Sequence, residues 1–391
     1  MRRLAVTVRS TTSKRRWLTA ALAFGLLAST MASAAWAAEN SRWTQFRGGP
    51  EQRGVAPEAL AGKLQPRWIF EAEGGVESTA AIADGVAYIG SLGGKFYALD
   101  LKTGAVKWTF DTGEEIKSSA LIDGGTVYFG DELGRFHAVD IETGKARWTF
   151  EAEAGISGSA NRAKECLLFG SYDNFIYCVK PEDGSLAWKV ETEGYVHGTP
   201  AISAGQAISS GCDGYLRVVD TATGKEVQRL EIGSYVAASP AVHDRRVVVG
   251  TFDNKVLAVD LGGDGKEPGI AWEYKHPERE FPFYASAAVT GDRILVAGRD
   301  KIVHALDPKT GKALWTHSTR ARIDSSPLVS GDRVYVADQA GLLFALALAD
   351  GEVVWKFDSG ASFTASPAIA EGTLVISTDD GQVYAFTGPP S

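Results

Sequence analysis

Five side chains that could carry acid–base or binding chemistry occupy one recurring position of a repeated sequence pattern. They are Glu77, Lys117, His197, Tyr284 and Asp324. The remaining copies of the pattern hold Ser157, Ala237 and Thr364 at that position. A fold needs no such mixture of acid, base, imidazole and phenol, so we expect these side chains to form a binding site. The alternative is a water-filled funnel in which the charges simply remain solvated.

Familiar catalytic and metal-binding spacings do not occur in the chain, so no catalytic residue and no metal site is predicted. There is no His-Glu-x-x-His, Cys-x-x-Cys-His, Gly-x-Ser-x-Gly or phosphate-loop motif. Asp260–Gly265 lacks the regular oxygen spacing of a calcium loop and is interpreted as an enlarged turn. Five scattered histidines are interpreted as structural: His137, His243, His276, His304 and His317.

The element that must position the candidate site is a β-hairpin unit that recurs along the chain. Ala305–Trp315 reads Ala-Leu-Asp-Pro-Lys-Thr-Gly-Lys-Ala-Leu-Trp, and the first copies repeat every 40 residues. The Asp can cap the turn and the Gly can adopt the positive φ that it needs. The tryptophan column, in which Gln228 fills one place, is expected to dock neighbouring units: Trp68, Trp108, Trp148, Trp188, Trp272, Trp315 and Trp355.

Four short alternating strands per repeat predict an all-β, eight-bladed β-propeller of four-stranded antiparallel blades. Inner strands are expected to begin near Ser78, Ser118, Gly158, Gly198, Ala238, Ala285, Ser325 and Ala365. The last blade lacks an outer strand, and Pro66–Glu71 is a spare one. We therefore expect the N-terminal strand to complete the last blade and close the ring.

Two further columns belong to the expected channel. One is always Ser or Thr and is interpreted as structural, since small hydroxyls can bond a neighbour's backbone near the axis: Thr79, Ser119, Ser159, Thr199, Ser239, Ser286, Ser326 and Ser366. The loops above the candidate site carry aromatic and arginine side chains, which are typical of binding hot spots. The partner-docking candidates are Tyr195, Tyr235, Arg279, Phe281, Phe283, Arg320 and Arg322. Phe363 belongs to the same loops, and some rings could instead plug the channel.

The N-terminus predicts export. Residues 1–37 combine a basic start, an apolar run and an Ala35-Trp36-Ala37 cleavage site, with no cysteine for a lipid anchor. Removing its six basic residues changes the formal net charge from −8 to −14, which argues against nucleic acid as a partner. We expect an arm over residues 38–63 whose aromatics pack on the propeller, the propeller over 64–387, and a tail over 388–391.

Three cysteines, Cys166, Cys178 and Cys212, are an odd set for an exported chain. Cys166 and Cys178 are expected on paired strands of the third blade but on opposite faces. That placement disfavours a disulfide, so buried thiols are predicted.

The Ala-x-Asp-x-x-Thr-Gly-x-x-x-Trp unit resembles the tryptophan-docking motif of the quinoprotein superfamily, and the resemblance covers Pro66–Phe386. Its eight-bladed dehydrogenases bind pyrroloquinoline quinone (PQQ) with calcium, whereas its BamB-type members are non-enzymatic propellers of outer-membrane assembly. The enzymes are longer and hold the quinone between a tryptophan and two adjacent cysteines, which this chain lacks. BamB-type propellers are lipoproteins that dock through a Leu-x-Leu-Arg stretch, and this chain has neither feature.

The resemblance therefore implies a BamB-like binder of protein partners in the periplasm or cell envelope, without a cofactor, without a transmembrane segment and as a monomer. The alternative is a small PQQ- and calcium-dependent dehydrogenase of alcohols or sugars, with Glu77, Lys117, His197, Tyr284 and Asp324 as its site. A small-ligand sensor that uses the same funnel is a third possibility.

Overall fold

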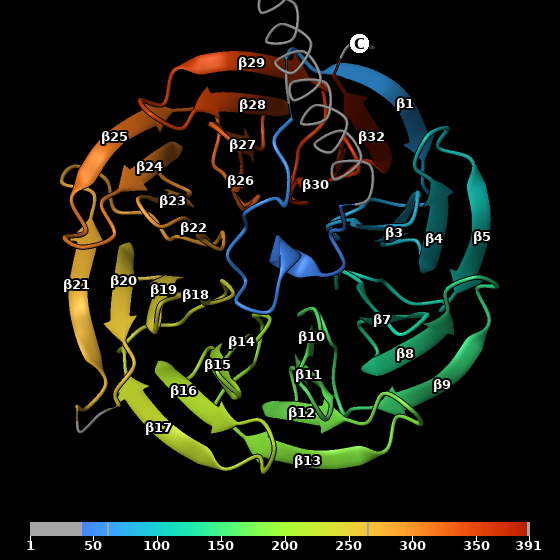
Figure 1. Cartoon of the computed structure of the whole chain (residues 1–391), viewed down its shortest axis with the longest axis horizontal. Helices are drawn as coiled ribbons and strands as arrows, with labels where there is room; N and C mark the ends of the chain where they lie inside the picture. Colours follow the sequence, from blue (N-terminus) through green and yellow to red (C-terminus); the bar gives the residue numbers. More distant parts are fainter. Residues whose placement is uncertain (1–40, 61, 264–265, 389–391) are drawn as a thin grey trace, which may run out of the picture. The chain divides into compact units, whose positions relative to one another are not determined.

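Each copy of the repeat forms one four-stranded antiparallel sheet in the computed structural model, which describes residues 41–60, 62–263 and 266–388. Eight such sheets surround a central axis as the blades of a propeller (Figure 1), which confirms the predicted fold class. The proposed signal peptide, residues 38–40 of the arm, residues 264–265 of the enlarged turn and residues 389–391 of the tail lie outside the described residues. No helix of the described part has the length and apolarity needed to cross a membrane.

The strands of the first four blades, from the axis outward, are β2 (Ala81–Ala83), β3 (Val86–Gly90), β4 (Lys95–Asp100), β5 (Val106–Asp111); β6 (Leu121–Asp123), β7 (Thr126–Gly130), β8 (Arg135–Asp140), β9 (Ala146–Glu151); β10 (Asn161–Arg162), β11 (Leu167–Gly170), β12 (Phe175–Val179), β13 (Leu186–Glu191); and β14 (Ala201–Ser203), β15 (Gln206–Ser210), β16 (Tyr215–Asp220), β17 (Glu226–Glu231). Those of the next three are β18 (Ala241–His243), β19 (Arg246–Gly250), β20 (Lys255–Asp260), β21 (Gly269–Lys275); β22 (Ala288–Val289), β23 (Ile294–Ala297), β24 (Ile302–Leu306), β25 (Ala313–Ser318); and β26 (Leu328–Ser330), β27 (Arg333–Ala337), β28 (Leu342–Ala347), β29 (Val353–Asp358).

The last blade is built from both ends of the described chain. Its strands are β30 (Ala368–Ala370), β31 (Thr373–Ser377), β32 (Gln382–Thr387) and, as the outer strand, β1 (Gln65–Glu71). β1 pairs antiparallel with β32, with Ile69 opposite Tyr384. Without β1, β32 would present an unpaired edge.

Local turn chemistry explains why each repeat forms a hairpin. In the first blade, Asp100 Oδ1 accepts a hydrogen bond from the Thr103 amide at 2.8 Å and another from its hydroxyl at 2.8 Å. The following Gly104 has a φ of +74°, a left-handed conformation that glycine adopts without strain. The predicted cap and turn are both present.

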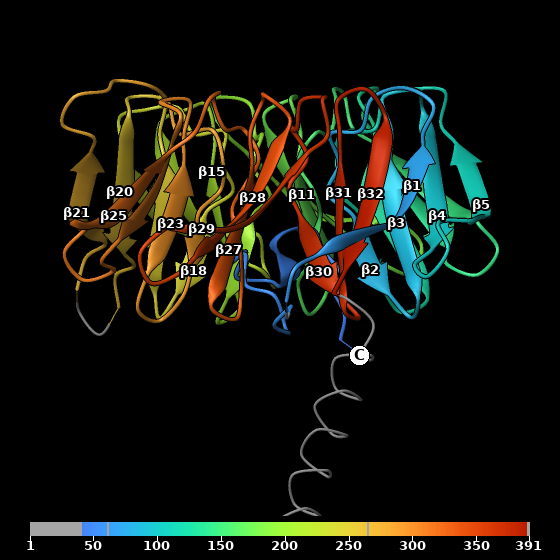
Figure 2. The same cartoon turned by 90° about the horizontal axis from the view of Figure 1, so that it is seen from above.

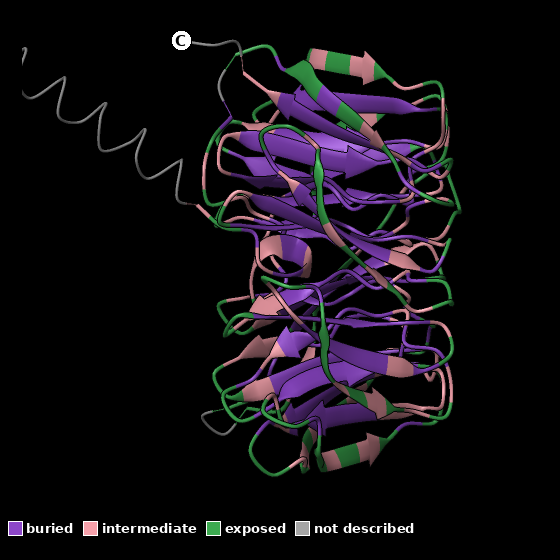
Figure 3. Cartoon of the chain, turned by 90° about the vertical axis from the view of Figure 1, so that its right-hand side faces the viewer, coloured by how far each residue is buried: buried purple, intermediate pink, exposed green. Residues whose placement is uncertain are grey.

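Tryptophans join one blade to the next. Each of the seven predicted docking tryptophans donates its indole N–H to a backbone carbonyl of the neighbouring blade at 2.9–3.1 Å. Trp68 also packs against Gly104, where an added Cβ would lie 2.8 Å from the ring. Gln228 replaces tryptophan in the fourth blade, and its amide donates to the Gly262 carbonyl at 3.3 Å. The second and third strands of the blades are mostly buried, whereas the outer strands are largely exposed (Figure 3).

The inner strands begin later than the sequence predicts. The first starts at Ala81 rather than near Ser78, and the other seven are displaced in the same way. The Ser78 hydroxyl accepts a hydrogen bond from the Gly90 amide at 3.0 Å and donates one to the Gly90 carbonyl at 2.8 Å. The Ser78 side chain thus takes the place of the backbone–backbone hydrogen bonds that would extend the strand pair. The residues before each inner strand bond to the next blade instead, as described below.

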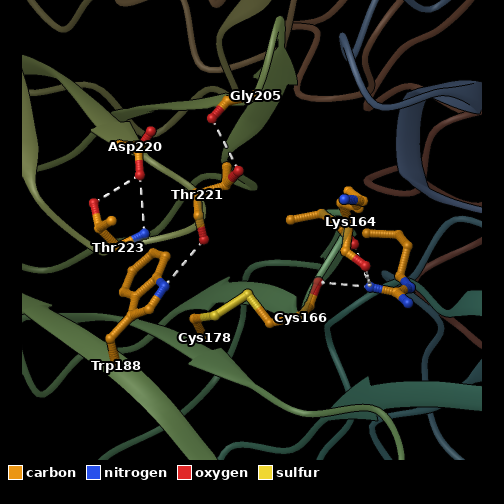
Figure 4. The surroundings of a disulfide bond; sticks show 10 residues. Lys164, Cys166, Cys178, Trp188, Gly205, Asp220, Thr221 and Thr223 are labelled. Carbon is orange, nitrogen blue, oxygen red and sulfur yellow. Dashed lines mark hydrogen bonds between the residues drawn. A yellow bond between two sulfur atoms is a disulfide. The ribbon is translucent and has the colours of Figure 1, made fainter.

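The prediction of free thiols at Cys166 and Cys178 is wrong, because these residues form a disulfide (Figure 4). Leu168 lies opposite Cys178 in the β11–β12 ladder. Cys166 is two residues from Leu168 and therefore points to the same face as Cys178, not to the opposite one. Their Cα atoms are 5.5 Å apart, within the usual range for a disulfide. Cys212 is free.

The N-terminal arm crosses the centre of the ring (Figure 1). Inner-strand amides of six blades donate to arm carbonyls at 2.7–2.9 Å, from Ile82, Ile122, Ile202, Val242, Val289 and Val329. The third blade bonds Pro50 through the Asn161 side chain at 2.8 Å, and the eighth bonds the Ser41 hydroxyl through the Glu371 amide at 2.8 Å. Trp43 is 1 % exposed, so the arm packs on the propeller as predicted.

Candidate functional site

Connecting loops gather at the two ends of the blades (Figure 2). The arm covers one end of the axis. We call the other end the mouth, where loops lead from each outer strand to the next inner strand. A cavity of about 290 Å³ lies on the axis, and all five candidates line it: Glu77, Lys117, His197, Tyr284 and Asp324. The structure therefore brings together residues that are up to 247 positions apart (324 − 77).

Phe46 also lines the cavity, and it belongs to the short arm helix η1 (Phe46–Gly48). The adjacent Arg47 is 1 % exposed, and its guanidinium donates to the carbonyls of Ala287 at 3.0 Å and Pro327 at 2.6 Å. Burial lowers the pKa of Arg47 to about 9, so the side chain stays charged at neutral pH. Arg47 thus anchors the arm to the sixth and seventh blades, next to the Phe46 side chain that lines the cavity.

The Ser/Thr column forms a closed circle of hydrogen bonds, which we call the hydroxyl belt. Thr79 N–H donates to the Ser119 hydroxyl at 2.9 Å, Ser119 N–H donates to Ser159, and the pattern continues around the ring. Ser366 N–H returns to the Thr79 hydroxyl at 3.3 Å. The other links are 2.8–3.0 Å long and run Ser159–Thr199, Thr199–Ser239, Ser239–Ser286, Ser286–Ser326 and Ser326–Ser366.

His197 lies between two tyrosines above the belt. Its Nδ1 is 2.5 Å from the Tyr172 hydroxyl, and its Nε2 is 3.0 Å from the Tyr284 hydroxyl. Burial lowers the pKa of His197, so the imidazole is neutral at neutral pH and offers one donor and one acceptor. One phenol must therefore donate to the ring and the other must accept from it. Burial also raises the pKa of Tyr284 to about 12, which keeps that phenol protonated.

Asp324 is held by two arginines. It is 8 % exposed, and its carboxylate lies 2.7 Å from Arg299 Nε and 3.1 Å from Arg322 Nε. The Arg299 guanidinium also lies 4.6 Å from the centre of the Tyr284 ring. This cation–π contact connects the charged group to the Tyr–His–Tyr chain.

Lys117 and Glu77 line the cavity from the loops that precede the second and the first blade. The Lys117 ammonium lies 3.4 Å from both Glu115 and Glu132. Burial acts to lower the pKa of Lys117, but Glu132 and Glu115 outweigh it, so the pKa lies above its usual value. Burial raises the pKa of Glu77, and Lys117 opposes that rise. Glu132 also accepts a hydrogen bond from the Ser157 hydroxyl.

A second variable column was missed by the sequence analysis. Its residues lie in the loops between the second and third strands of the blades, and several of them hold the predicted candidates: Leu92, Glu132, Tyr172, Cys212, Phe252, Arg299, Gln339 and Asp379. Each amide of this column donates to a carbonyl of a mouth loop, as Tyr172 does to Gly155 at 3.0 Å. The signal in the sequence is the same as for the first column, namely diversity at a fixed repeat position.

The docking candidates differ in exposure. Tyr195, Tyr235 and Phe281 are 55 %, 60 % and 51 % exposed. The prediction for Phe283 is wrong, because it is 1 % exposed and packs in the core between the fifth and sixth blades. Phe363 is also buried. The arginine candidates lie on the surface, where Arg279 donates to the Asp300 carbonyl at 2.5 Å. Arg320 and Arg322 are exposed, and Arg322 pairs with Asp324 as above.

An apolar arc extends along the mouth. In the part of the chain that the structure describes, most exposed large apolar side chains lie on outer strands. The others all lie in loops on the mouth side, from the second blade to the loop before the sixth, and we call them the apolar arc: Leu133, Tyr195, Tyr235, Phe252 and Phe281. Exposed apolar side chains gathered on one face are typical of interaction surfaces.

The channel lining does not match the arrangement by which the resemblance implies that a quinone is held. None of the described tryptophans lines the cavity. The disulfide joins Cys166, immediately before β11, to Cys178 on β12, 12 residues further along the chain, rather than two adjacent cysteines. Among residues 41–60, 62–263 and 266–388, no group of three His, Cys, Asp or Glu side chains is placed to hold a metal ion. The lining residues therefore lack the tryptophan and the adjacent cysteines of that arrangement.

Comparison with known proteins gives both a family and a fold. A family model described as outer membrane protein assembly factor BamB matches residues 35–171, 173–325 and 299–388. No curated protein matches the chain.

Three solved structures illustrate the range of proteins that share this fold. BamB from Moraxella catarrhalis has a TM-score of 0.70 at 17 % identity, covering 83 % of this chain and 99 % of its own. Quinohemoprotein alcohol dehydrogenase from Comamonas testosteroni has a TM-score of 0.74 at 14 % identity, covering 94 % and 85 %. The computationally designed protein Ika8 has a TM-score of 0.71 at 16 % identity, covering 86 % and 99 %. At these identities the likeness is one of fold.

Proposed function

This chain belongs to the family of the outer membrane protein assembly factor BamB, and from that premise we propose that it is an exported, non-enzymatic scaffold. It binds protein partners in the periplasm or cell envelope, in a role of the outer-membrane assembly type. β1 closes the ring, and the arm covers one end of its axis. The mouth is the other end, and its loops differ in sequence from blade to blade. The scaffold binds its partner through that face as a monomer.

The observation that carries this proposal is the apolar arc. Tyr195, Tyr235 and Phe281 are each more than half exposed, although aromatic side chains bury large areas when they find a partner. Arg320 and Arg322 lie in the next mouth loop along the ring. Tyrosine and arginine are the side chains most often found at the energetic centre of protein interfaces. The other exposed apolar side chains lie singly on outer strands, at positions that recur from blade to blade, and do not require a binding partner to explain them.

Site-specific crosslinking in cells tests the proposal. A photoreactive amino acid at position 235 should capture a discrete envelope protein, whereas the same group at Val106, an exposed position on outer strand β5, should not. Phe281→Ala should weaken capture without a change in melting temperature, because its side chain is exposed. The proposal is wrong if both positions give the same pattern, or if capture from position 235 survives simultaneous replacement of Tyr195 and Phe281 by Ala.

A dehydrogenase remains the second candidate, because an acid, a base and a phenol line one cavity. Calorimetric titration with PQQ, with and without calcium, separates the two. The scaffold predicts no binding at high micromolar quinone. Tight, calcium-dependent binding at one site per chain would instead favour the dehydrogenase over the scaffold. Dye reduction lost in both Glu77→Gln and Asp324→Asn, without unfolding, would then assign those side chains to the reaction.

A further inference from the structure

The hydroxyl belt has unused hydrogen-bond donors. Each belt oxygen accepts a backbone N–H, as the Ser119 hydroxyl does from Thr79. A hydroxyl carries one proton as well as its acceptor sites. Within the described residues, none of the eight belt hydroxyls donates that proton to a protein acceptor, and all eight line the axial cavity. The belt therefore presents its protons to whatever occupies the channel.

These donors are withdrawn from bulk solvent. The belt residues are 2–5 % exposed, and Phe46 of the arm lines the same cavity. A buried donor without an acceptor is unfavourable, so an occupant with several acceptor oxygens is favoured. The backbone amide that bonds each hydroxyl oxygen also polarises its O–H group, because hydrogen bonds in a chain strengthen one another.

The charges that line the cavity disfavour a strongly charged occupant. Lys117 opposes a cation, and Glu77 opposes an anion. Asp324 is already neutralised by two arginines. Glu77 has no hydrogen bond and no ion pair within the described residues, so its carboxyl group can bond a hydroxyl of an occupant. The Tyr284 and Phe46 rings provide apolar surface between these polar groups.

We propose that the axial channel is a binding site for one small, uncharged polyhydroxy molecule about the size of a monosaccharide. The belt donates to its oxygens, Glu77 bonds one of its hydroxyls, and Tyr284 and Phe46 contact its C–H surface. The cavity volume of about 290 Å³ lies near the lower end of the range for small-molecule sites. This site is separate from the apolar arc, so the outcome of its test does not depend on whether the scaffold function is correct.

Calorimetric titration of the full mature chain tests the proposal with three neutral probes: D-glucose, D-sorbitol and myo-inositol. Gluconate and glucosamine are matched charged probes, since they keep the polyhydroxy skeleton and add an anion or a cation. We expect saturable binding of at least one neutral probe at one site per chain. The charged probes should bind about tenfold more weakly, equivalent to about 1.4 kcal/mol. No saturable heat with any neutral probe, which means a channel filled only by water, would overturn the proposal, as would preference for either charged probe.

Two variants place the bound molecule in the channel. Ala237 lines the cavity, so Ala237→Trp should abolish binding by filling it, while Ala313→Trp on exposed outer strand β25 should have no effect. Glu77→Gln breaks no hydrogen bond of the fold and should weaken binding severalfold, which provides a test that does not depend on the folding of Ala237→Trp. Binding unchanged in Glu77→Gln and in a folded Ala237→Trp protein would show that the molecule binds elsewhere, and the proposal would be wrong.

Discussion

At the scale of single residues, His197 holds the wall of the channel together. Its two ring nitrogens face the Tyr172 and Tyr284 hydroxyls, and its lowered pKa keeps the imidazole neutral. A protonated imidazole would have two donors and no acceptor, so the phenol that donates to His197 would lose its partner. Proton uptake at this position therefore opposes the folded arrangement.

His197→Gln should reduce the loss of stability on acidification. Because the folded pKa of His197 lies below its unfolded value, the unfolded chain takes up the proton first, and stability falls as pH drops through the unfolded value of about 6.5. Thermal melts of the wild type between about pH 7.5 and about pH 5.5 should therefore show a larger decrease than those of the variant. Half-buried His276 offers the control, since His276→Gln should leave the wild-type decrease unchanged. Equal slopes in wild type and His197→Gln would exclude this role.

At the scale of elements, the arm does more than cover one end of the channel. It forms hydrogen bonds with every blade, and its Trp43 and Arg47 side chains are buried. The inner strands are only two or three residues long, so each has few ladder bonds of its own. The arm thus supplies the inner ends of the blades with partners that the short strands cannot provide.

Trp43→Ala should destabilise the protein by about 3–5 kcal/mol, the usual cost of truncating a large buried aromatic side chain. Urea unfolding followed by circular dichroism measures the change. Arg42→Ala is the neighbouring control: its ion pair with Asp84 is exposed, so its loss should cost at most about 1 kcal/mol. Similar midpoints for Trp43→Ala and Arg42→Ala would mean that the arm contributes little to the fold.

The disulfide stabilises the hairpin of the third blade. It links residues 12 positions apart, so it restricts only a short loop of the unfolded chain. Replacement of both Cys166 and Cys178 by Ala should cost about 2–4 kcal/mol. Cys212→Ser, at a free and partly exposed position, should have little effect in the same unfolding assay. A double variant as stable as Cys212→Ser would argue against a structural role for the bridge.

At the scale of the whole molecule, the ring is closed by a strand from the opposite end of the sequence. β1 precedes the first blade, yet it is the outer strand of the last one. Ring closure therefore couples the start of the propeller to its end, and it covers β32, which would otherwise be a sheet edge.

Phe70→Pro should open this closure. Phe70 lies in the middle of β1 opposite Val383, and the Ala72 amide two residues further on donates to the Gly381 carbonyl at 2.8 Å. By the two-residue alternation of an antiparallel ladder the Phe70 amide also faces β32, where proline has no N–H to donate. We expect a lower melting temperature and concentration-dependent self-association through exposed β32, measured by light scattering and sedimentation. Ile69→Pro is the control: the Ile69 amide faces away from β32, so proline removes no ladder bond there and the variant should remain monomeric. A monomeric Phe70→Pro protein with wild-type stability would contradict the closure.

The sequence by itself determined the blade, the number of blades and the residues that face the channel. Asp100, Gly104 and Trp68 act over a few residues or on the adjacent repeat, so their spacing carries the information directly. The five channel candidates could be grouped because one repeat position becomes one layer of the ring. Their partners Tyr172 and Arg299 were not identified, although they occupy a repeat position with the same kind of diversity.

Only the tertiary structure decided the features that depend on distant segments or on register. The path of the arm across all eight blades brings residues 41–58 against residues as far along the chain as Gly372, and no local pattern encodes such contacts. The burial of Phe283 depends on how two blades pack. The Cys166–Cys178 bridge depends on strand register, because a shift of one residue turns a side chain to the other face of the sheet. Short-range chemistry repeats in the sequence, whereas these long-range pairings occur once and arise only when the ring closes.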